Sequence, residues 1–298
     1  MQETSVLESV IKRDRVIVIV GLLTVIVLSW IYILLGAGMG MSAFEMSSIS
    51  WPWQSSSDMA MPSKPMGSEN ASGQGMGAVM EKAHTAMMQP AVWTPSYAML
   101  MFIMWWVMMI AMMLPSASPM ILIFARVNRM QKAQGAPFVP TTVFAAGYLV
   151  AWGLFSLVAA GLQWGLERMG LLSAMLGSTS AIFGGLVLIA AGIYQFTPLK
   201  HACLRHCRHP FQFVTHYWRT GTLGAFRMGM EHGGYCLACC WFLMALLFVG
   251  GVMNLYWIIG LALFVLLEKA IPAGHWLEYV TGVGLILWGG WVMAGMGV

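Results

Sequence analysis

The amino-acid sequence predicts an all-α protein: a polytopic bundle of about seven transmembrane helices with a cytoplasmic N-terminus. The chain has 298 residues, of which 59% are hydrophobic and only 9% are charged, and its mean hydropathy is +0.76. It contains about seven apolar runs near the roughly 20 residues that a spanning helix needs. Because a helix satisfies its own backbone hydrogen bonds, these runs are interpreted as helices that contact the lipid bilayer. The net charge of +4 does not indicate a nucleic-acid partner, since the basic residues gather at the ends of the apolar runs.

The apolar runs divide the chain into three parts. Residues 1–38 form an N-terminal tail and a first helix at about 16–38, which is too long for the apolar part of a signal peptide and is interpreted as retained. Residues 39–94 form a polar, largely irregular, Met-rich loop outside the cytoplasm. Residues 95–298 form a six-helix transmembrane core with a cytoplasmic Cys/His-rich loop at 198–233. The core helices are expected at about 95–124, 141–165, 174–197, 234–252, 255–271 and 276–296.

The distribution of lysine and arginine orients these helices. With the N-terminus in the cytoplasm, twelve basic residues fall on the cytoplasmic side, and only Lys64, Lys82 and Arg168 fall outside. Short cytoplasmic loops carry the excess of positive charge in membrane proteins, so the pattern favours this orientation. Seven spans then place the C-terminus outside, unless residues 271–274 form a re-entrant bend.

The helix expected at 95–124 carries a ladder of methionines. Met104, Met108 and Met112 recur at every fourth position, which places them on one face of a helix. Thioether sulfur is a soft ligand that suits Cu(I), although methionine also fills gaps between packed helices. Pro115 and Pro119 remove backbone donors and predict a kink beyond the ladder. The candidate ligands in this helix are Met104, Met108, Met109, Met112, Met113 and Met120.

The polar loop at 39–94 is also rich in methionine. An irregular loop has no core to fill, so packing explains these side chains poorly, and low-complexity composition is the competing explanation. Thioethers persist in an oxidising compartment, where free thiols tend to form disulfides. The loop is therefore expected to capture a soft metal. Its candidate ligands are Met39, Met41, Met46, Met59, Met61, Met66, Met76, Met80, Met87, Met88 and His84.

Three of the five cysteines lie within five residues of each other. In a helix, Cys236, Cys239, Cys240 and Met244 share one face, and His232 joins them if the helix extends one turn back. Apolar burial is the alternative for cysteines in a helix. Because the cytoplasm keeps thiols reduced, a disulfide is not expected here, and we favour metal ligation.

Cys203 and Cys207 lie among the histidines of the predicted cytoplasmic loop. They are candidate ligands as well, and the sequence leaves open whether they meet the second group of cysteines in space. A zinc site is less favoured than copper, because Cys-x2-Cys-Cys does not match zinc-finger spacing. Glu268 and Lys269 are interpreted as a local ion pair, with a proton or cation site as the alternative.

Four motifs resemble those of a bacterial family of predicted metal-binding integral membrane proteins, a domain of unknown function. They are Met108–Met120, Tyr194–Lys200, Cys236–Met244 and Gly251–Leu255, and the resemblance covers roughly residues 95–290. It implies a multi-pass protein of the bacterial inner membrane that binds metal. In its chemistry alone, the chain is also similar to small trimeric copper uptake transporters, which combine an external Met-rich segment, a Met-x3-Met helix and an internal His/Cys exit.

Three functional hypotheses follow from these observations. The first is a membrane copper-handling protein that binds Cu(I). The order from thioether ligands outside to Cys/His ligands inside fits inward conduction, with static binding as the alternative. The second is an accessory or assembly subunit of a larger membrane metalloenzyme, such as a copper-dependent oxygenase or oxidase, with other membrane subunits or a copper chaperone as partners. The third is a membrane thiol oxidoreductase, which is disfavoured because no thioredoxin-type setting surrounds the cysteines. No catalytic constellation is recognised, so an enzyme is not expected.

Overall fold

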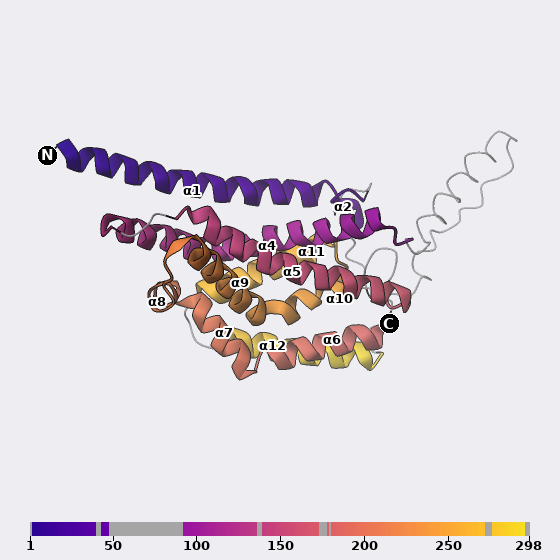
Figure 1. Ribbon diagram of the computed structural model, residues 1–298. Coiled ribbons are helices and arrows are strands. Elements are labelled where there is room, and N and C mark those ends of the chain that lie inside the picture. The colour runs from indigo at the N-terminus through magenta and orange to yellow at the C-terminus, as the bar shows by residue number, and fades with distance from the viewer. Residues whose placement is uncertain are drawn as a thin grey trace, which may run out of the picture.

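The computed structural model describes residues 2–39, 43–47, 92–135, 139–172, 178, 180–271 and 276–295 (Figure 1). Regular secondary structure in these ranges is helical, apart from one isolated bridge between Leu172 and Ser178, so the predicted all-α class is confirmed. Most of the predicted outer loop lies outside the described residues, including His84 and every loop methionine except Met39 and Met46.

Four long helices dominate the described part of the chain. They are α1 (Gln2–Leu34), α4 (Pro95–Ala133), α5 (Thr141–Arg168) and α9 (Gly221–Ala245). Each provides a segment long and apolar enough to cross a membrane. A fifth span results if α6 (Ala181–Tyr194) and α7 (Pro198–Arg208), which meet at a bend of 65°, count as one broken helix. The membrane character is thus supported, while the number of seven spans stays a prediction.

The remaining helices are shorter. The expected sixth and seventh spans correspond to α11 (Leu255–Ala270), with 16 residues, and α12 (Trp276–Met293), with 18 residues. Both fall below the roughly 20 residues that span a bilayer without adjustment. Three short helices complete the described part: α2 (Ala43–Met46), α8 (Pro210–His216) and α10 (Leu247–Gly250).

The segment at 198–233, which we expected to be a loop, is mostly helical. It forms α7, α8 and the first half of α9, which begins at Gly221 instead of the predicted residue 234. The side chain of Thr197 accepts a hydrogen bond from the Lys200 amide, and Pro198 occupies the first turn of α7. This capping pattern starts a helix independently of hydropathy. Helix α7 is polar, so a pattern of apolar runs could not predict it.

Helix α4 carries the methionine ladder along the middle of the molecule. Thr94 caps its start by accepting a hydrogen bond from the Tyr97 amide, and the helix continues through Pro115 and Pro119 to Ala133. It packs against α1, α5 and α11, and Figure 1 shows α1 and α4 side by side. The ladder is consequently enclosed by neighbouring helices.

Close packing of α5 on α9 depends on two glycines. A Cβ atom on Gly147 would lie 2.1 Å from the Phe226 carbonyl oxygen, and one on Gly229 would lie 2.0 Å from the Phe144 carbonyl oxygen. Small residues allow such backbone approach between membrane helices. The contact places Tyr148 of α5 directly against the cysteine face of α9.

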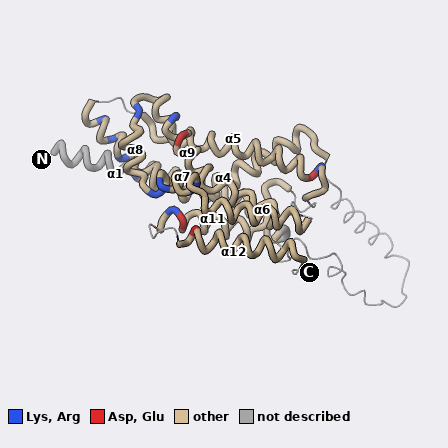
Figure 2. Tube along the Cα trace, turned by 90° about the horizontal axis from the view of Figure 1, so that it is seen from below, with Lys and Arg blue, Asp and Glu red and all other residues tan. Residues whose placement is uncertain are grey.

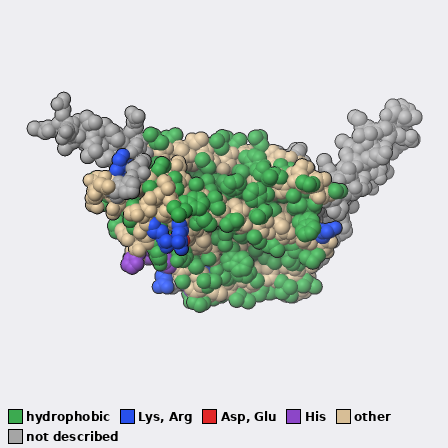
Figure 3. Space-filling model, viewed as in Figure 1, with side chains coloured by type: hydrophobic (Ala, Val, Ile, Leu, Met, Phe, Trp, Pro, Cys, Tyr) green, Lys and Arg blue, Asp and Glu red, His purple; other side chains and the backbone are tan. Residues whose placement is uncertain are grey.

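The surface separates apolar and charged regions. Figure 3 shows one face covered largely by hydrophobic side chains, and Leu154, Leu157 and Val158 on α5 are each more than half exposed. Such a surface suits contact with lipid tails. Lys and Arg gather at the end of the molecule that holds α8 and the start of α9 (Figure 2).

Candidate metal centre

The predicted ligands of α9 form a single buried face. The side chains of His232, Cys236, Cys239, Cys240 and Met244 are at most 3% exposed. The helix extends back through the two glycines that follow His232, so the condition for including this histidine is met. All five cysteines of the chain are free thiols.

The ladder of α4 reaches this face. Met113 Sδ lies 4.0 Å from Cys240 Sγ. The structure therefore brings a thioether of the ladder together with a thiol of α9, although 127 residues separate them in the sequence. The other predicted ladder ligands, all buried, are Met104, Met108, Met109, Met112 and Met120.

Helix α7 adds one more thiol. The half-buried Cys207 lies close to the thiols of Cys236 and Cys239. Cys203 lies one turn earlier on α7, is buried, and makes no hydrogen bond with a described thiol of α9. The two cysteine groups thus meet through Cys207, while Cys203 stands apart from the contact.

Two polar side chains that the sequence analysis did not assign to the site contact the same sulfur atom. Lys269 Nζ lies 3.0 Å from Cys236 Sγ and 3.1 Å from the Ser116 hydroxyl. The Tyr148 hydroxyl lies 3.2 Å from Cys236 Sγ and donates a hydrogen bond of 3.3 Å to the Met113 carbonyl. An ammonium group at this position offsets the negative charge that thiolate ligands bring into a buried site.

The expected ion pair between Glu268 and Lys269 is absent from the described residues, since adjacent positions on α11 point in different directions. Glu268 pairs instead with Lys200 of α7 at 2.7 Å, and both side chains are fully buried. Glu278 of α12 pairs with His201 at 2.6 Å and with Arg208 at 3.1 Å. These pairs attach α7 to α11 and α12 and so hold Cys207 in place.

The sulfur atoms are not arranged as a finished coordination sphere. Within the described ranges, no three His, Cys, Asp or Glu side chains are placed to hold one metal ion. The thiols of Cys239 and Cys240 each donate to the Cys236 carbonyl at 3.0 Å, so both point along the helix instead of towards a common centre. A change of side-chain rotamer would redirect them. Soft sulfur donors beside an imidazole are nevertheless the donor set that suits Cu(I).

His232 supplies the imidazole of this set. Its ring stacks near those of Tyr148 and Phe213, with both centroids 5.6 Å away, and Nδ1 has no hydrogen-bond partner among the described residues. A buried ring nitrogen without a partner is energetically unfavourable. A metal ion at this position would satisfy it.

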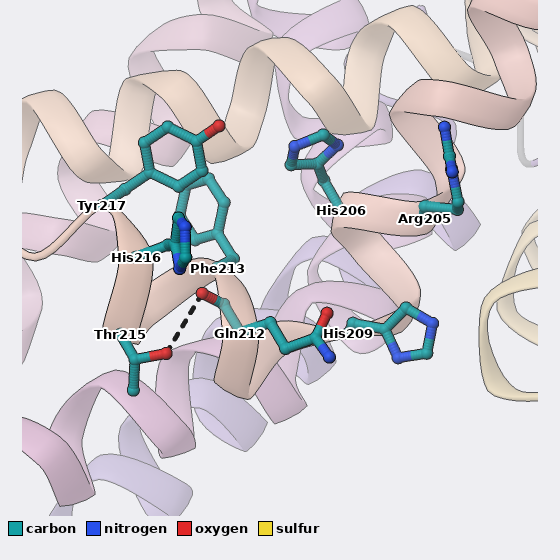
Figure 4. Close-up of a pocket in the computed structure, with 8 residues that line it drawn as sticks. All are labelled: Arg205, His206, His209, Gln212, Phe213, Thr215, His216 and Tyr217. Carbon is teal, nitrogen blue, oxygen red and sulfur yellow. Dashed lines mark hydrogen bonds between the residues drawn. The ribbon is translucent and has the colours of Figure 1, made fainter.

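A cleft of about 600 Å³ is lined by side chains of α7, of α8 and of the residues that follow these helices (Figure 4). Phe213 lines it and also packs on His232, while His206 stacks on Tyr235 with centroids 4.2 Å apart. Aromatic side chains therefore separate the cleft from the thiols. The residues that line the cleft are Arg205, His206, His209, Gln212, Phe213, Thr215, His216 and Tyr217.

Comparison with known proteins assigns the chain to a family. A family model described as a copper chaperone, PpoB2, matches residues 102–292, which include α5 to α11 and most of α4 and α12. No curated protein and no solved structure matches the chain. The matched segment contains every described ligand candidate of α4, α7 and α9, together with the contact between Met113 and Cys240. The chain belongs to the PpoB2 copper chaperone family and has a copper-handling role.

Proposed function

We propose that this protein binds Cu(I) in the membrane and conducts it from Met-rich outer ligands to the Cys/His ligands near the positively charged end. One observation carries the proposal: Met113 Sδ lies 4.0 Å from Cys240 Sγ, so the thioether ladder reaches the thiols. The proposed ligands are Met104, Met108, Met109, Met112, Met113, Met120, Cys203, Cys207, His232, Cys236, Cys239, Cys240 and Met244.

The order of ligands supports a direction of transfer. Thioethers are neutral, soft ligands, whereas thiolates add a negative charge that attracts the cation. Copper that moves along α4 therefore meets stronger ligands at Cys240, Cys236 and Cys239, with Lys269 offsetting the charge. Transfer is downhill in this direction.

The positive-inside pattern supports the orientation in the bacterial inner membrane. The charged end, with α8 and the cleft, then faces the cytoplasm, and the ladder begins on the outer side. The Met-rich loop, which lies outside the described residues, collects Cu(I) there. Zinc remains the less favoured cargo, because the ladder offers thioether sulfur, which suits Cu(I), whereas zinc prefers thiolate, imidazole and carboxylate ligands.

The family description favours delivery to a partner as a second candidate function. A copper chaperone hands its metal to another protein, which fits the hypothesis of an assembly subunit for a membrane copper oxygenase or oxidase. The half-buried Cys207 and the imidazole-lined cleft provide a route of release towards such a partner. Copurification with other chains after extraction in mild detergent would identify this role.

Copper content of the purified protein tests the proposal. We expect stoichiometric copper by mass spectrometry after anaerobic loading with Cu(I), and loss of most of it in the Cys236→Ser/Cys239→Ser/Cys240→Ser variant. Met113→Leu conserves volume but removes the thioether, so we expect reduced loading with an unchanged elution profile. Met99→Leu is the matched control, because Met99 lies on the same helix and is 59% exposed. Equal copper in the wild type and the triple variant, with both folded, would refute the thiol site.

A further inference from the structure

A second polar cluster lies at the opposite end of the ladder. Met101 of α4 and Gln163 of α5 are both fully buried, and Gln163 Nε2 donates a hydrogen bond of 3.3 Å to Met101 Sδ. The Gln163 carbonyl oxygen accepts one of 2.7 Å from Trp105 Nε1. A buried amide in an apolar segment is costly unless its hydrogen bonds are made, and here they are made to the ladder helix itself.

The same amide connects Met101 to a carboxylate. Gln163 Nε2 also donates to Glu167 Oε1 at 2.8 Å, and Trp93 Nε1 donates to Glu167 Oε2 at 2.6 Å. Glu167 is half-buried and lies one turn after Gln163, at the C-terminal end of α5. The chain of contacts therefore runs from the surface, through Glu167 and Gln163, to the sulfur atom of Met101.

Glu167 has only neutral partners within the described part of the chain. No described residue forms an ion pair with it, and the neighbouring Arg168 lies over the ring of Trp164, 5.3 Å from its centroid. Both of its hydrogen bonds come from neutral donors. A carboxylate in this setting attracts a cation and raises its local concentration.

We propose that Glu167, Gln163 and Met101 form a recruitment site for monovalent Cu(I) at the outer mouth of the ladder. This inference rests on the proposed function, since it supplies the first step of the same path. Glu167 attracts the cation, and Met101 Sδ becomes its first buried ligand once the sulfur exchanges the Gln163 hydrogen bond for the metal. Gln163 holds Met101 in position in the metal-free state and acts as a positioning residue.

The position of this cluster relative to the ladder supports the assignment. Met101 precedes Met104 and Met108 on α4, so a cation at Met101 has its next thioether one turn further along the helix. Trp105 packs beside the ladder against Phe248, with ring centroids 5.1 Å apart, and its indole nitrogen fixes the Gln163 carbonyl. These hydrogen bonds and ring contacts orient the side chains of the cluster, which favours a defined site over loose electrostatic attraction.

A binding assay in the absence of the thiols isolates this site. The assay uses a Cys207→Ala/Cys236→Ala/Cys239→Ala/Cys240→Ala background. Its Cu(I) affinity is measured by competition with a chelator that becomes coloured when it binds Cu(I). We expect Glu167→Gln and Met101→Leu each to weaken the residual binding several-fold. Glu231→Gln, which removes a carboxylate at the other end, and Met99→Leu, which removes an exposed thioether of α4, should leave it unchanged.

Loading rates provide a second readout that a purely structural role would not alter. With all cysteines present, we expect Glu167→Gln to slow initial Cu(I) loading several-fold at low salt, with less effect at high salt, while the final copper content stays at the wild-type level. Unchanged affinity and unchanged rates in both variants would overturn the recruitment site. A different result would separate the two proposals. If the wild-type protein holds no copper at its thiols but still shows residual binding that Met101→Leu weakens, the conduction proposal is overturned and the recruitment site stands.

Discussion

Cys236 is the residue at which several helices meet. Its sulfur atom contacts Tyr148 of α5, Cys207 of α7 and Lys269 of α11. Because the Cys236 side chain contacts three neighbouring helices, its surroundings depend on how these helices are arranged. Loading of the site therefore involves α5, α7 and α11 as well as α9.

At the scale of single residues, the two cysteines of α7 should differ. Cys207 lies close to the thiols of Cys236 and Cys239, whereas Cys203 lies one turn earlier on α7. We expect Cys207→Ser to lower Cu(I) affinity by at least the roughly 10–100-fold that second-shell changes cost, and Cys203→Ser to have a much smaller effect. Chelator competition on the two purified variants measures the difference. Equal losses would mean that Cys203 also reaches the metal.

Periodicity predicted part of this site and missed the rest for a physical reason. The face shared by Cys236, Cys239 and Cys240 follows from helical spacing. The structure confirms that the segment is helical, and it shows this face to be buried. Lys269 could not be assigned, because its role depends on which helix packs beside α9. The sequence predicted an ion pair between Lys269 and Glu268, but Glu268 pairs with the buried Lys200 of α7 instead.

At the scale of helices, the α5–α9 contact should be intolerant of added volume. Gly229→Val would place new atoms against the Phe144 carbonyl, where even a Cβ would lie at 2.0 Å, so the helices must move apart. We expect a loss of about 1–3 kcal/mol or more in the free energy of unfolding and a lower thermal midpoint in detergent. Gly161→Val on α5 is the matched control, because nothing lies within 4 Å of a Cβ there. Similar midpoints for both variants would contradict the close packing.

The helices themselves were predictable to different degrees. The long apolar helices α1, α4 and α5 follow from hydropathy, and their lengths in the structure differ from the expectation mainly at the ends. Helix α7 was not predicted because it is polar and because its start depends on the capping residues Thr197 and Pro198. Its position, held by buried ion pairs with α11 and α12, depends on tertiary contacts that no local pattern contains.

At the scale of the whole molecule, the distribution of charge predicts the topology. Met130 at the end of α4 and Met169 after α5 are 55% and 65% exposed and lie on opposite sides of the proposed membrane. We expect Met169→Cys to react with a membrane-impermeant thiol reagent added to spheroplasts and Met130→Cys to react only after permeabilisation. Labelling of Met130→Cys in intact spheroplasts would reverse the orientation.

The burial of the ladder has a consequence for chemical damage. Methionine oxidises to a polar sulfoxide, and susceptibility follows exposure to solvent. On α4, Met99 and Met130 are more than half exposed, while the sulfur atoms from Met101 to Met120 are enclosed by other helices. Peroxide reaching this protein should therefore modify the outlying methionines first. The copper path would remain intact while these exposed side chains act as sacrificial antioxidants around it.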